Sequence, residues 1–410
     1  VYAMTDLLSL ELGGLHLTGT VSANIGVDLN KLVTLDVSDN MLHGSFPAVS
    51  SIVSLTNLQI SGNSFSGTIP SDLNSLSNMI LFGAGGNLFE STIPGALVGM
   101  NLLQEFIVAG NKLTGIVPTF LGLLTDLVSL DLGRNLFYST IPTSLAELTG
   151  LTFLSLADNT LDGGISDVVT ASGLNALNIS FNSFSGPLPS ALFGLTKLDI
   201  LDLSDNVFDG VVSDVPTLVK LQLLHLSNNL FSGVIPSTVN DMASLQDISI
   251  SSNSFTGTIP STLYDLSDLV YVDMGDNKFD GTISISLSNF AKLRSLSLNN
   301  NKLSGDIPST IGGISLISLL DVSQNDFSGD IPDGITDCTN LHFLSLQDNR
   351  LHGSMPDDIG VLKSLTYLGL GSNDLSGTIP TSCTAIYGLK YLTLNNNNLE
   401  GSVPSGVYST

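Results

Sequence analysis

An asparagine returns at a nearly constant interval along almost all of this 410-residue chain. Sixteen asparagines lie 23 or 24 residues apart, and each of the last seven intervals is 24 residues long. They are Asn40, Asn63, Asn87, Asn111, Asn135, Asn159, Asn182, Asn206, Asn229, Asn253, Asn277, Asn301, Asn325, Asn349, Asn373 and Asn397. Leu15 takes the same place in a first, degenerate copy, which makes seventeen repeats. A unit this short cannot bury its own apolar side, so the period predicts copies that stack and share one core.

Each copy combines a short strand with a turn. In residues 365–380, LTYLGLGSNDLSGTIP, we expect Leu365, Leu368 and Leu370 to point inward from the strand, which Asn373 ends. Burying a leucine contributes roughly 1.5–3 kcal/mol, so the array is stable only as a stack with parallel strands. The asparagine amide both donates and accepts, and we expect it to satisfy backbone groups of the next copy. An unmet group there would cost about 1–3 kcal/mol.

Glycine, proline and a large apolar residue keep fixed places after the asparagine. Glycine follows four residues later in fourteen of the sixteen copies, as a bend with positive φ favours. Proline follows seven residues later in thirteen of the seventeen copies, where its missing N–H must point away from any ladder. Leucine or phenylalanine stands two residues after the asparagine in every copy. We expect these side chains to form an inner spine.

The resulting pattern, LxxLxLxxNxLxGxIPxxLxxLxxL, resembles the plant-type leucine-rich repeat family over nearly all of residues 7–404. This family includes ectodomains of receptor-like kinases and receptor-like proteins, and polygalacturonase inhibitors. The resemblance implies an α/β repeat solenoid, a leucine-rich-repeat superhelix with a concave parallel β-sheet, short second strands and 3-10 turns on the convex side. Family ectodomains usually carry cysteine-containing caps and a Trp-bearing leader. Residues 1–410 contain neither pattern, so we expect a single solenoid with uncapped ends.

The charge balance excludes some classes of partner. The formal net charge is −25, and the 12 basic residues are scattered along the chain. Binding of nucleic acid or of an anionic membrane depends on Lys and Arg, so neither is an expected partner. No apolar run approaches the roughly 20 residues of a membrane-spanning helix, and the chain does not open with a secretory leader. With the family resemblance, this predicts an extracellular or cell-surface protein whose signal peptide and any anchor lie outside this segment.

The outward positions of the expected strands form a small, polar and mildly acidic stripe, because side chains alternate along a strand. Asp202, His225 and Asp273 belong to this stripe and are candidate ligand-binding residues. So wide and shallow a surface suits an extended ligand better than a closed reaction pocket.

Three aromatic residues lie beside this polar stripe. Phe343, Tyr367 and Tyr391 stand two positions before the stripe in consecutive copies. One interpretation is a platform for a sugar chain or a peptide, since aromatic rings bury area with few rotors to freeze. The alternative is structural, because aromatic residues suit strands and cover neighbouring backbone.

Three copies share the variant D-N-x-[LF]-D-G-x-[IV]-S, in which serine replaces the usual proline. The paired acids are Asp158 and Asp162, Asp205 and Asp209, and Asp276 and Asp280. One hypothesis is a site for a hard cation such as calcium, with Asp202 and Asp273 adding a third acid in two copies. The alternative is turn chemistry, in which Asp-Gly favours the bend and the serine caps local amides. No other cofactor is expected.

Two further features concern covalent chemistry. Asn178-Ile179-Ser180 is the only N-x-[ST] triplet, so Asn178 is a glycosylation candidate on the inner strand face. Cys338 and Cys383 stand two copies apart at apolar positions. At about 4.8 Å per strand their Cα atoms should lie near 10 Å apart, beyond the roughly 7 Å limit of a disulfide, so we expect buried thiols.

The sequence leaves two function classes open. The first is a non-enzymatic extracellular recognition or adhesion module that binds protein, peptide or glycan through its extended surface. The second is a structural protein that self-associates, through its ends or lateral faces, into a surface coat, matrix or filament. The histidines occupy different copies and repeat positions, and no zinc-protease or phosphate-loop motif is present, so an enzyme is not expected.

Overall fold

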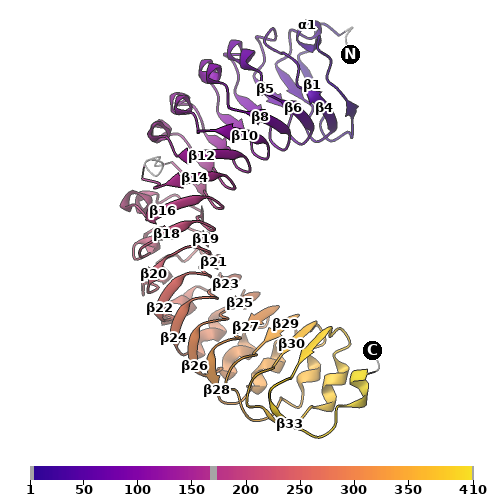
Figure 1. Ribbon diagram of the computed structural model, residues 1–410, viewed down its shortest axis with the longest axis vertical. Coiled ribbons are helices and arrows are strands. Elements are labelled where there is room, and N and C mark those ends of the chain that lie inside the picture. The colour runs from indigo at the N-terminus through magenta and orange to yellow at the C-terminus, as the bar shows by residue number, and fades with distance from the viewer. Residues whose placement is uncertain (1–3, 167–172, 409–410) are drawn as a thin grey trace. The chain divides into compact units, whose positions relative to one another are not determined.

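The computed structural model describes residues 4–166 and 173–408 of the chain. These form two compact units, Val1–Phe208 and Asp209–Thr410, which are described separately. Each unit is a stack of coils. Each coil contributes an inner strand and a turn, and most coils add a short second strand and a helical turn on the opposite side (Figure 1). The predicted leucine-rich-repeat solenoid with a parallel sheet and 3-10 turns is therefore confirmed within each unit.

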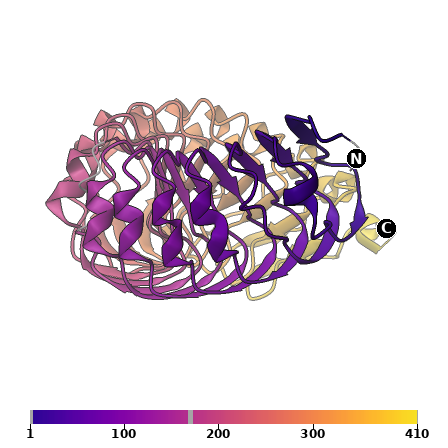
Figure 2. The same cartoon turned by 90° about the horizontal axis from the view of Figure 1, so that it is seen from above.

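In the first unit the inner strands pair in chain order, every one parallel to the next. They are β1 (Ser9–Glu11), β3 (Thr34–Asp36), β5 (Asn57–Gln59), β7 (Leu81–Gly83), β9 (Glu105–Ile107), β11 (Ser129–Asp131), β13 (Phe153–Ser155), β15 (Ala176–Asn178) and β17 (Ile200–Asp202). Figure 2 shows these coils in a row, coloured from indigo to magenta. From β3 onward the middle residue of each strand is buried, so the flanking residues form the surface that we call the inner face.

Second strands and helical turns complete the first unit. The second strands are β2 (Thr18–Gly19), β4 (Met41–Ser45), β6 (Ser64–Gly67), β8 (Leu88–Ser91), β10 (Lys112–Gly115), β12 (Leu136–Thr140), β14 (Thr160–Gly163) and β16 (Ser183–Pro187), and β18 (Val207–Asp209) crosses the boundary between the units. The helical turns are α1 (Ile25–Asp28) and the 3-10 turns η1 (Ser71–Ser75), η2 (Gly95–Gly99), η3 (Thr119–Leu123), η4 (Thr143–Glu147) and η5 (Ser190–Gly194). The prolines of the repeat stand directly before η1 to η5, outside the strand ladders, as the missing N–H requires.

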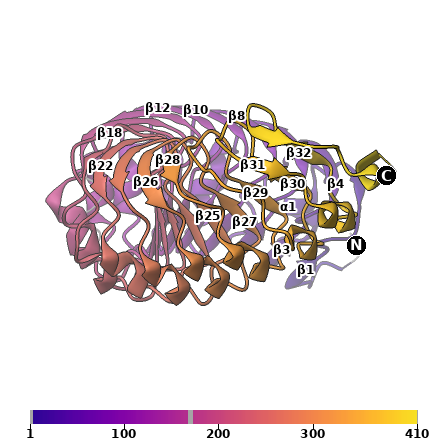
Figure 3. The same ribbon diagram turned by 90° about the horizontal axis from the view of Figure 1, so that it is seen from below.

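The second unit repeats this plan. Its inner strands are β19 (Leu223–His225), β21 (Asp247–Ser249), β23 (Tyr271–Asp273), β25 (Ser295–Ser297), β27 (Leu319–Asp321), β29 (Phe343–Ser345), β30 (Tyr367–Gly369) and β32 (Tyr391–Thr393). Its second strands are β20 (Ser232–Gly233), β22 (Ser254–Thr258), β24 (Lys278–Gly281), β26 (Lys302–Asp306), β28 (Asp326–Ser328), β31 (Ser376–Thr378) and β33 (Asn398–Glu400). Its 3-10 turns are η6 (Val215–Thr217), η7 (Val239–Asp241), η8 (Ser261–Asp265), η9 (Ile285–Asn289), η10 (Ser309–Gly313), η11 (Asp333–Asp337), η12 (Ile359–Val361), η13 (Thr381–Ala385) and η14 (Ser405–Tyr408). Figure 3 shows turns of this unit in a row along one edge.

The repeated asparagine attaches each coil to the coil before it. The Asn135 side chain is buried; its Oδ1 accepts the N–H of Leu113 at 3.0 Å and its Nδ2 donates to the carbonyl of Val108 at 3.0 Å. The same Nδ2 also donates to two carbonyls of its own coil, those of Leu132 and Gly133. The sequence prediction was wrong about direction, since both inter-coil bonds reach the preceding coil and not the next. The reason is that the turn after the strand places the asparagine amide against the backbone of the preceding coil.

A left-handed residue before each repeated asparagine was not predicted from the sequence. The residue directly before the asparagine has φ near +50° in coil after coil, including Arg134 and Phe181, whereas glycine holds this place at Gly62, Gly86 and Gly110. The predicted positive φ of the later glycine is confirmed, for example at Gly233 and Gly257. Each turn therefore bends through two left-handed residues, one on each side of the asparagine.

A spine of large apolar side chains fills the core, as predicted. Phe231, Phe255 and Phe279 are fully buried and stack in succession, with ring centroids 6.4 and 6.1 Å apart.

Cys338 and Cys383 are buried free thiols, which confirms the sequence prediction. Within the described ranges no helix has both the length and the apolar content that crossing a bilayer requires.

Replacing Asn135 by Ala should lower the free energy of unfolding by about 2–4 kcal/mol, because it leaves several buried backbone groups without partners. Chemical denaturation measures this loss, and hydrogen exchange should show the Leu113 amide exchanging faster. Asn101 is exposed, so Asn101→Ala is a matched control that should change neither quantity. Equal stability of the two variants would contradict the role given to the buried amide.

Burial raises the pKa of the Cys338 and Cys383 thiols from 9.0 to about 11, with the Asp337 carboxylate adding to the effect at Cys338. Because each pKa is higher in the folded state than in the unfolded state, the protonated thiols favour folding. Their contribution to the free energy of unfolding is complete below pH 9 and is lost as the pH rises through 11. At pH 9 iodoacetamide should label neither cysteine in the native protein and both in guanidinium chloride. Rapid native labelling of either thiol, measured by mass spectrometry, would contradict this burial.

Candidate functional site

Strand register places the three predicted aromatic residues in one row on the inner face of the second unit. Phe343 pairs with Tyr367, and Tyr367 with Tyr391, across β29, β30 and β32. The first two rings stack with centroids 4.5 Å apart and planes inclined by 10°, and the second and third lie 6.1 Å apart at 43°. Tyr391 is 64% exposed, whereas Phe343 and Tyr367 are half-buried against each other. The row therefore presents one open ring and the edges of two packed ones.

Hydrogen bonding fixes the middle ring of this aromatic row. The Tyr367 hydroxyl donates to the Gln347 Oε1 at 3.3 Å. A ring held by stacking and by a hydrogen bond has little rotational freedom left to lose when a ligand covers it. The aromatic row is thus preorganised as a contact surface.

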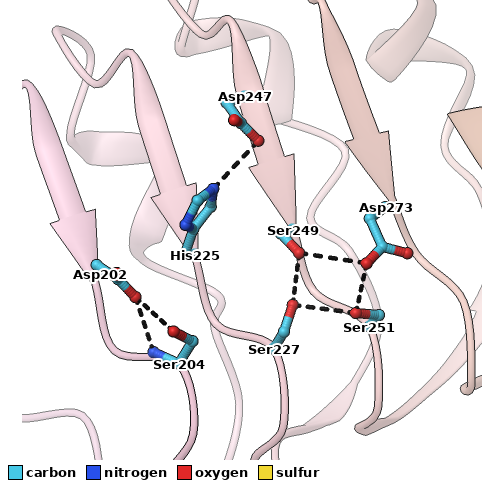
Figure 4. A network of polar contacts seen from close by, with 8 residues as sticks. All are labelled: Asp202, Ser204, His225, Ser227, Asp247, Ser249, Ser251 and Asp273. Carbon is cyan, nitrogen blue, oxygen red and sulfur yellow. Dashed lines mark hydrogen bonds and ion pairs between the residues drawn. The ribbon is translucent and has the colours of Figure 1, made fainter. Parts of the chain in front are cut away.

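A polar network occupies another part of the inner face of the second unit (Figure 4). The His225 Nε2 lies 3.2 Å from the Asp247 Oδ1, on the neighbouring strand. The Asp273 Oδ2 accepts hydrogen bonds from the hydroxyls of Ser251 at 2.6 Å and Ser249 at 3.4 Å. The predicted residues His225 and Asp273 therefore share this face but are engaged with different partners.

Asp202 lies on the inner face of the first unit. Its Oδ1 accepts from the backbone N–H of Ser204 at 3.1 Å and from the Ser204 hydroxyl at 2.7 Å, as Figure 4 shows. Asp36 and Asp321 make the same pair of bonds to the serine two residues on. One carboxylate oxygen thus holds the turn, while the other remains on the surface.

A depression of about 740 Å³ in the first unit was not predicted from the sequence. Its floor is a row of four residues in register on neighbouring strands, Asp131, Ser155, Asn178 and Asp202. Its rim comes from the turns that follow these strands and includes the following residues: Gly133, Arg134, Ala157, Asp158, Ser180 and Phe181. Gly133 has no side chain, so one end of the depression is open. A Cβ at this position would lie 3.1 Å from the Ser155 Oγ.

The paired acids proposed as calcium ligands lie at two places in the turn. Asp158, Asp205 and Asp276 are the left-handed residues before the asparagine, and their partners Asp162, Asp209 and Asp280 lie on the second strands. Among the described residues, no group of three or more His, Cys, Asp or Glu is placed to hold a metal. In this part of the chain Asp202 and Asp273 are therefore not grouped with the paired acids into a three-acid site; Asp202 bonds to Ser204, and Asp273 to Ser249 and Ser251.

The turn-chemistry alternative is borne out in one copy of this variant. The Ser284 Oγ accepts from the Ser286 N–H at 3.1 Å and so caps η9, which is where proline stands in other copies. Calcium binding by the acidic pairs remains a prediction.

The predicted glycosylation triplet belongs to the floor of the depression. The Asn178 Oδ1 accepts from the N–H and hydroxyl of Ser180 at 3.0 and 2.7 Å, and Ser180 is only 3% exposed. Asn178 thus takes the same turn-holding place that Asp202 takes in the next coil. Its glycosylation remains a prediction.

Comparison with known proteins identifies the repeat. The leucine-rich repeat family models match residues 219–279, and residues 54–76, 173–195, 292–314, 340–362 and 388–409. A 76-residue segment is 42% identical to the LRR receptor-like serine/threonine-protein kinase GSO2 of Arabidopsis thaliana, and covers 18% of this chain and 6% of that kinase. The chain therefore matches only a small fraction of that relative's length.

Solved structures are similar over the whole chain. The plant peptide hormone receptor RGFR1, solved with RGF2, matches with a TM-score of 0.88 and 29% identity over 99% of this chain and 69% of that chain. The Arabidopsis receptor kinase HAESA, solved with the peptide hormone IDA and the co-receptor SERK1, matches with a TM-score of 0.69 and 28% identity over 100% of this chain and 81% of that chain. Repeat pattern, coil geometry and these matches together show that the chain is a leucine-rich repeat protein of the plant type.

Proposed function

We propose that this chain is a non-enzymatic recognition module of the extracellular or cell-surface type, which binds an extended peptide along the inner faces of its coils. The observation that carries the proposal is the stacked row of Phe343, Tyr367 and Tyr391, which offers aromatic surface on an otherwise small and polar sheet. The peptide-hormone complexes of the similar receptors RGFR1 and HAESA support a peptide as the ligand class.

The geometry of the inner face favours an extended ligand. Neighbouring inner strands lie about 4.8 Å apart, and an extended peptide advances about 3.3 Å per residue, so a peptide running along the stack meets a new coil every one to two residues. Short, polar side chains beside a rigid aromatic row allow backbone contacts around a few anchoring side chains.

Selection from a random peptide library on the purified chain tests the proposal. Selected peptides should bind saturably in isothermal titration calorimetry. Hydrogen exchange should then show protection of inner strands, such as β29 to β32, and little change in the 3-10 turns. Failure to select any saturable peptide, or protection confined to the 3-10 turns, would overturn the proposal.

Removing the two tyrosine rings should weaken the binding of a peptide that the aromatic row anchors. The double variant Tyr367→Ala/Tyr391→Ala should lower affinity about tenfold or more, because truncating an aromatic anchor at a contact centre costs more than 1 kcal/mol. Tyr387→Ala is the matched control, since Tyr387 is 77% exposed and lies two residues after η13, outside the inner strands. Equal affinity for both variants, with unchanged melting temperature, would remove the aromatic row from the binding surface.

A further inference from the structure

The depression in the first unit has a floor of fixed geometry. Asp131, Ser155, Asn178 and Asp202 each end an inner strand, and direct pairing aligns them across β11, β13, β15 and β17. Acidic side chains stand at the two ends of this row, and a hydroxyl and an amide stand between them. A ligand lying along the stack would meet the groups in this order.

Several polar groups on this floor have no protein partner. Asp131 and Asp202 each use Oδ1 to accept from the turn that follows, at 3.0 Å from the Gly133 N–H and 3.1 Å from the Ser204 N–H. Within the described residues, Oδ2 of each carboxylate makes no hydrogen bond to protein. A matched pair of open anionic oxygens is therefore presented by a rigid frame.

Ser155 places a hydroxyl between the two acids, without a partner in the described part of the protein. Its side chain lines the depression, the residue is only 8% exposed, and its Oγ makes no hydrogen bond with any described residue. The small exposed fraction of this residue faces the depression, so its hydroxyl is open to a ligand there. A hydroxyl in this position is suited to donate to a backbone carbonyl of a bound chain.

The spacing of the two acids sets the spacing of a matching ligand. Asp131 and Asp202 are three strand intervals apart, about 14 Å at 4.8 Å per interval. In an extended peptide, residues i and i+4 lie on the same face and about 13 Å apart, whereas residues i and i+3 point to opposite faces. Side chains four residues apart therefore match the two carboxylates.

The charge of the lining favours a basic ligand. Asp131, Asp158 and Asp202 give three carboxylates against the single guanidinium of Arg134, and Arg134 forms no ion pair among the described residues. Phe181, 56% exposed, adds an apolar wall on which the stem of a long basic side chain can lie.

We propose, on the basis of the peptide-binding function above, that this depression is a subsite for an extended peptide with two basic side chains at positions i and i+4. Asp131 and Asp202 each bind one cation through the free Oδ2, and Ser155 donates to the peptide backbone between them. Charge at both ends and the interval between them together give the selectivity.

Two charge-matched peptides test this subsite on the full 410-residue chain. Both are capped, unstructured Ser/Gly peptides with two lysines, one with lysine at the second and sixth positions and the other at the second and fifth. The first should bind about fivefold more tightly at low salt, as expected for one added exposed ion pair, and the preference should weaken as salt rises. Fluorescence anisotropy of labelled peptides measures both affinities.

The variant Asp131→Asn/Asp202→Asn should remove the preference while leaving the fold intact. Asparagine preserves the turn-holding Oδ1, as Asn178 shows by accepting from Ser180 in the same way. Asp36→Asn/Asp321→Asn is the matched control, because both acids make the same turn bonds outside the depression, and it should retain the preference.

The outcomes separate this subsite from the general function. If both peptides bind equally to the native chain, or if the preference survives in the Asp131/Asp202 double variant, the subsite is wrong and peptide binding elsewhere on the inner face still stands. If neither peptide binds but library-selected peptides do, the subsite is again wrong and the general function stands. If no peptide of any kind binds, both proposals fail.

Discussion

One asparagine amide per coil, bonded to the backbone of the preceding coil, is the interaction on which this architecture depends. At Asn325, as at Asn135, the Oδ1 accepts a backbone N–H of the preceding coil and the Nδ2 donates to a carbonyl of that coil and to two of its own. An apolar residue at this place would leave these backbone groups buried without partners. Because the attachment is local to each pair of coils, the residues facing solvent on the inner strands are free to differ from coil to coil. Recognition can therefore vary along a backbone that does not change.

The sequence predicted most of the fold because the residues that determine it act at fixed places in the turn. Asparagine, glycine and proline each act through a backbone requirement, so their spacing translates directly into strand, bend and 3-10 turn. The left-handed residue before the asparagine was missed although a signal existed. Asp39, Gly62, Asn228 and Ser252 are residue types common in turns, and this bias was visible in the sequence. Arg134 and Phe181 show no such bias, and only their neighbours in the repeat explain their conformation.

The candidate binding surface was predicted less completely. The aromatic row could be found because Phe343, Tyr367 and Tyr391 occupy equivalent positions, and register alone makes them neighbours. The depression could not, because it depends on the relative sizes of side chains from four coils. Gly133 opens it, and Ser155 leaves room where neighbouring strands carry larger side chains. These are properties of a combination of coils, whereas a repeat pattern describes one coil at a time.

In the proposed function, the acidic residues of the inner face combine a structural role and a recognition role in one side chain. At Asp202 one oxygen holds the turn and the other faces solvent, so neutralising the charge separates the two roles without removing the turn. The negative net charge of the chain also disfavours self-association, which remains a hypothesis from the sequence. With 37 acidic and 12 basic residues, two copies of this chain repel each other beyond their contact surfaces, whereas a basic peptide is attracted. Exposed charges are screened over about 8 Å at physiological salt, so the repulsion between two copies acts only when their surfaces come close to contact. The charge balance thus favours a small cationic ligand over a second copy of the chain.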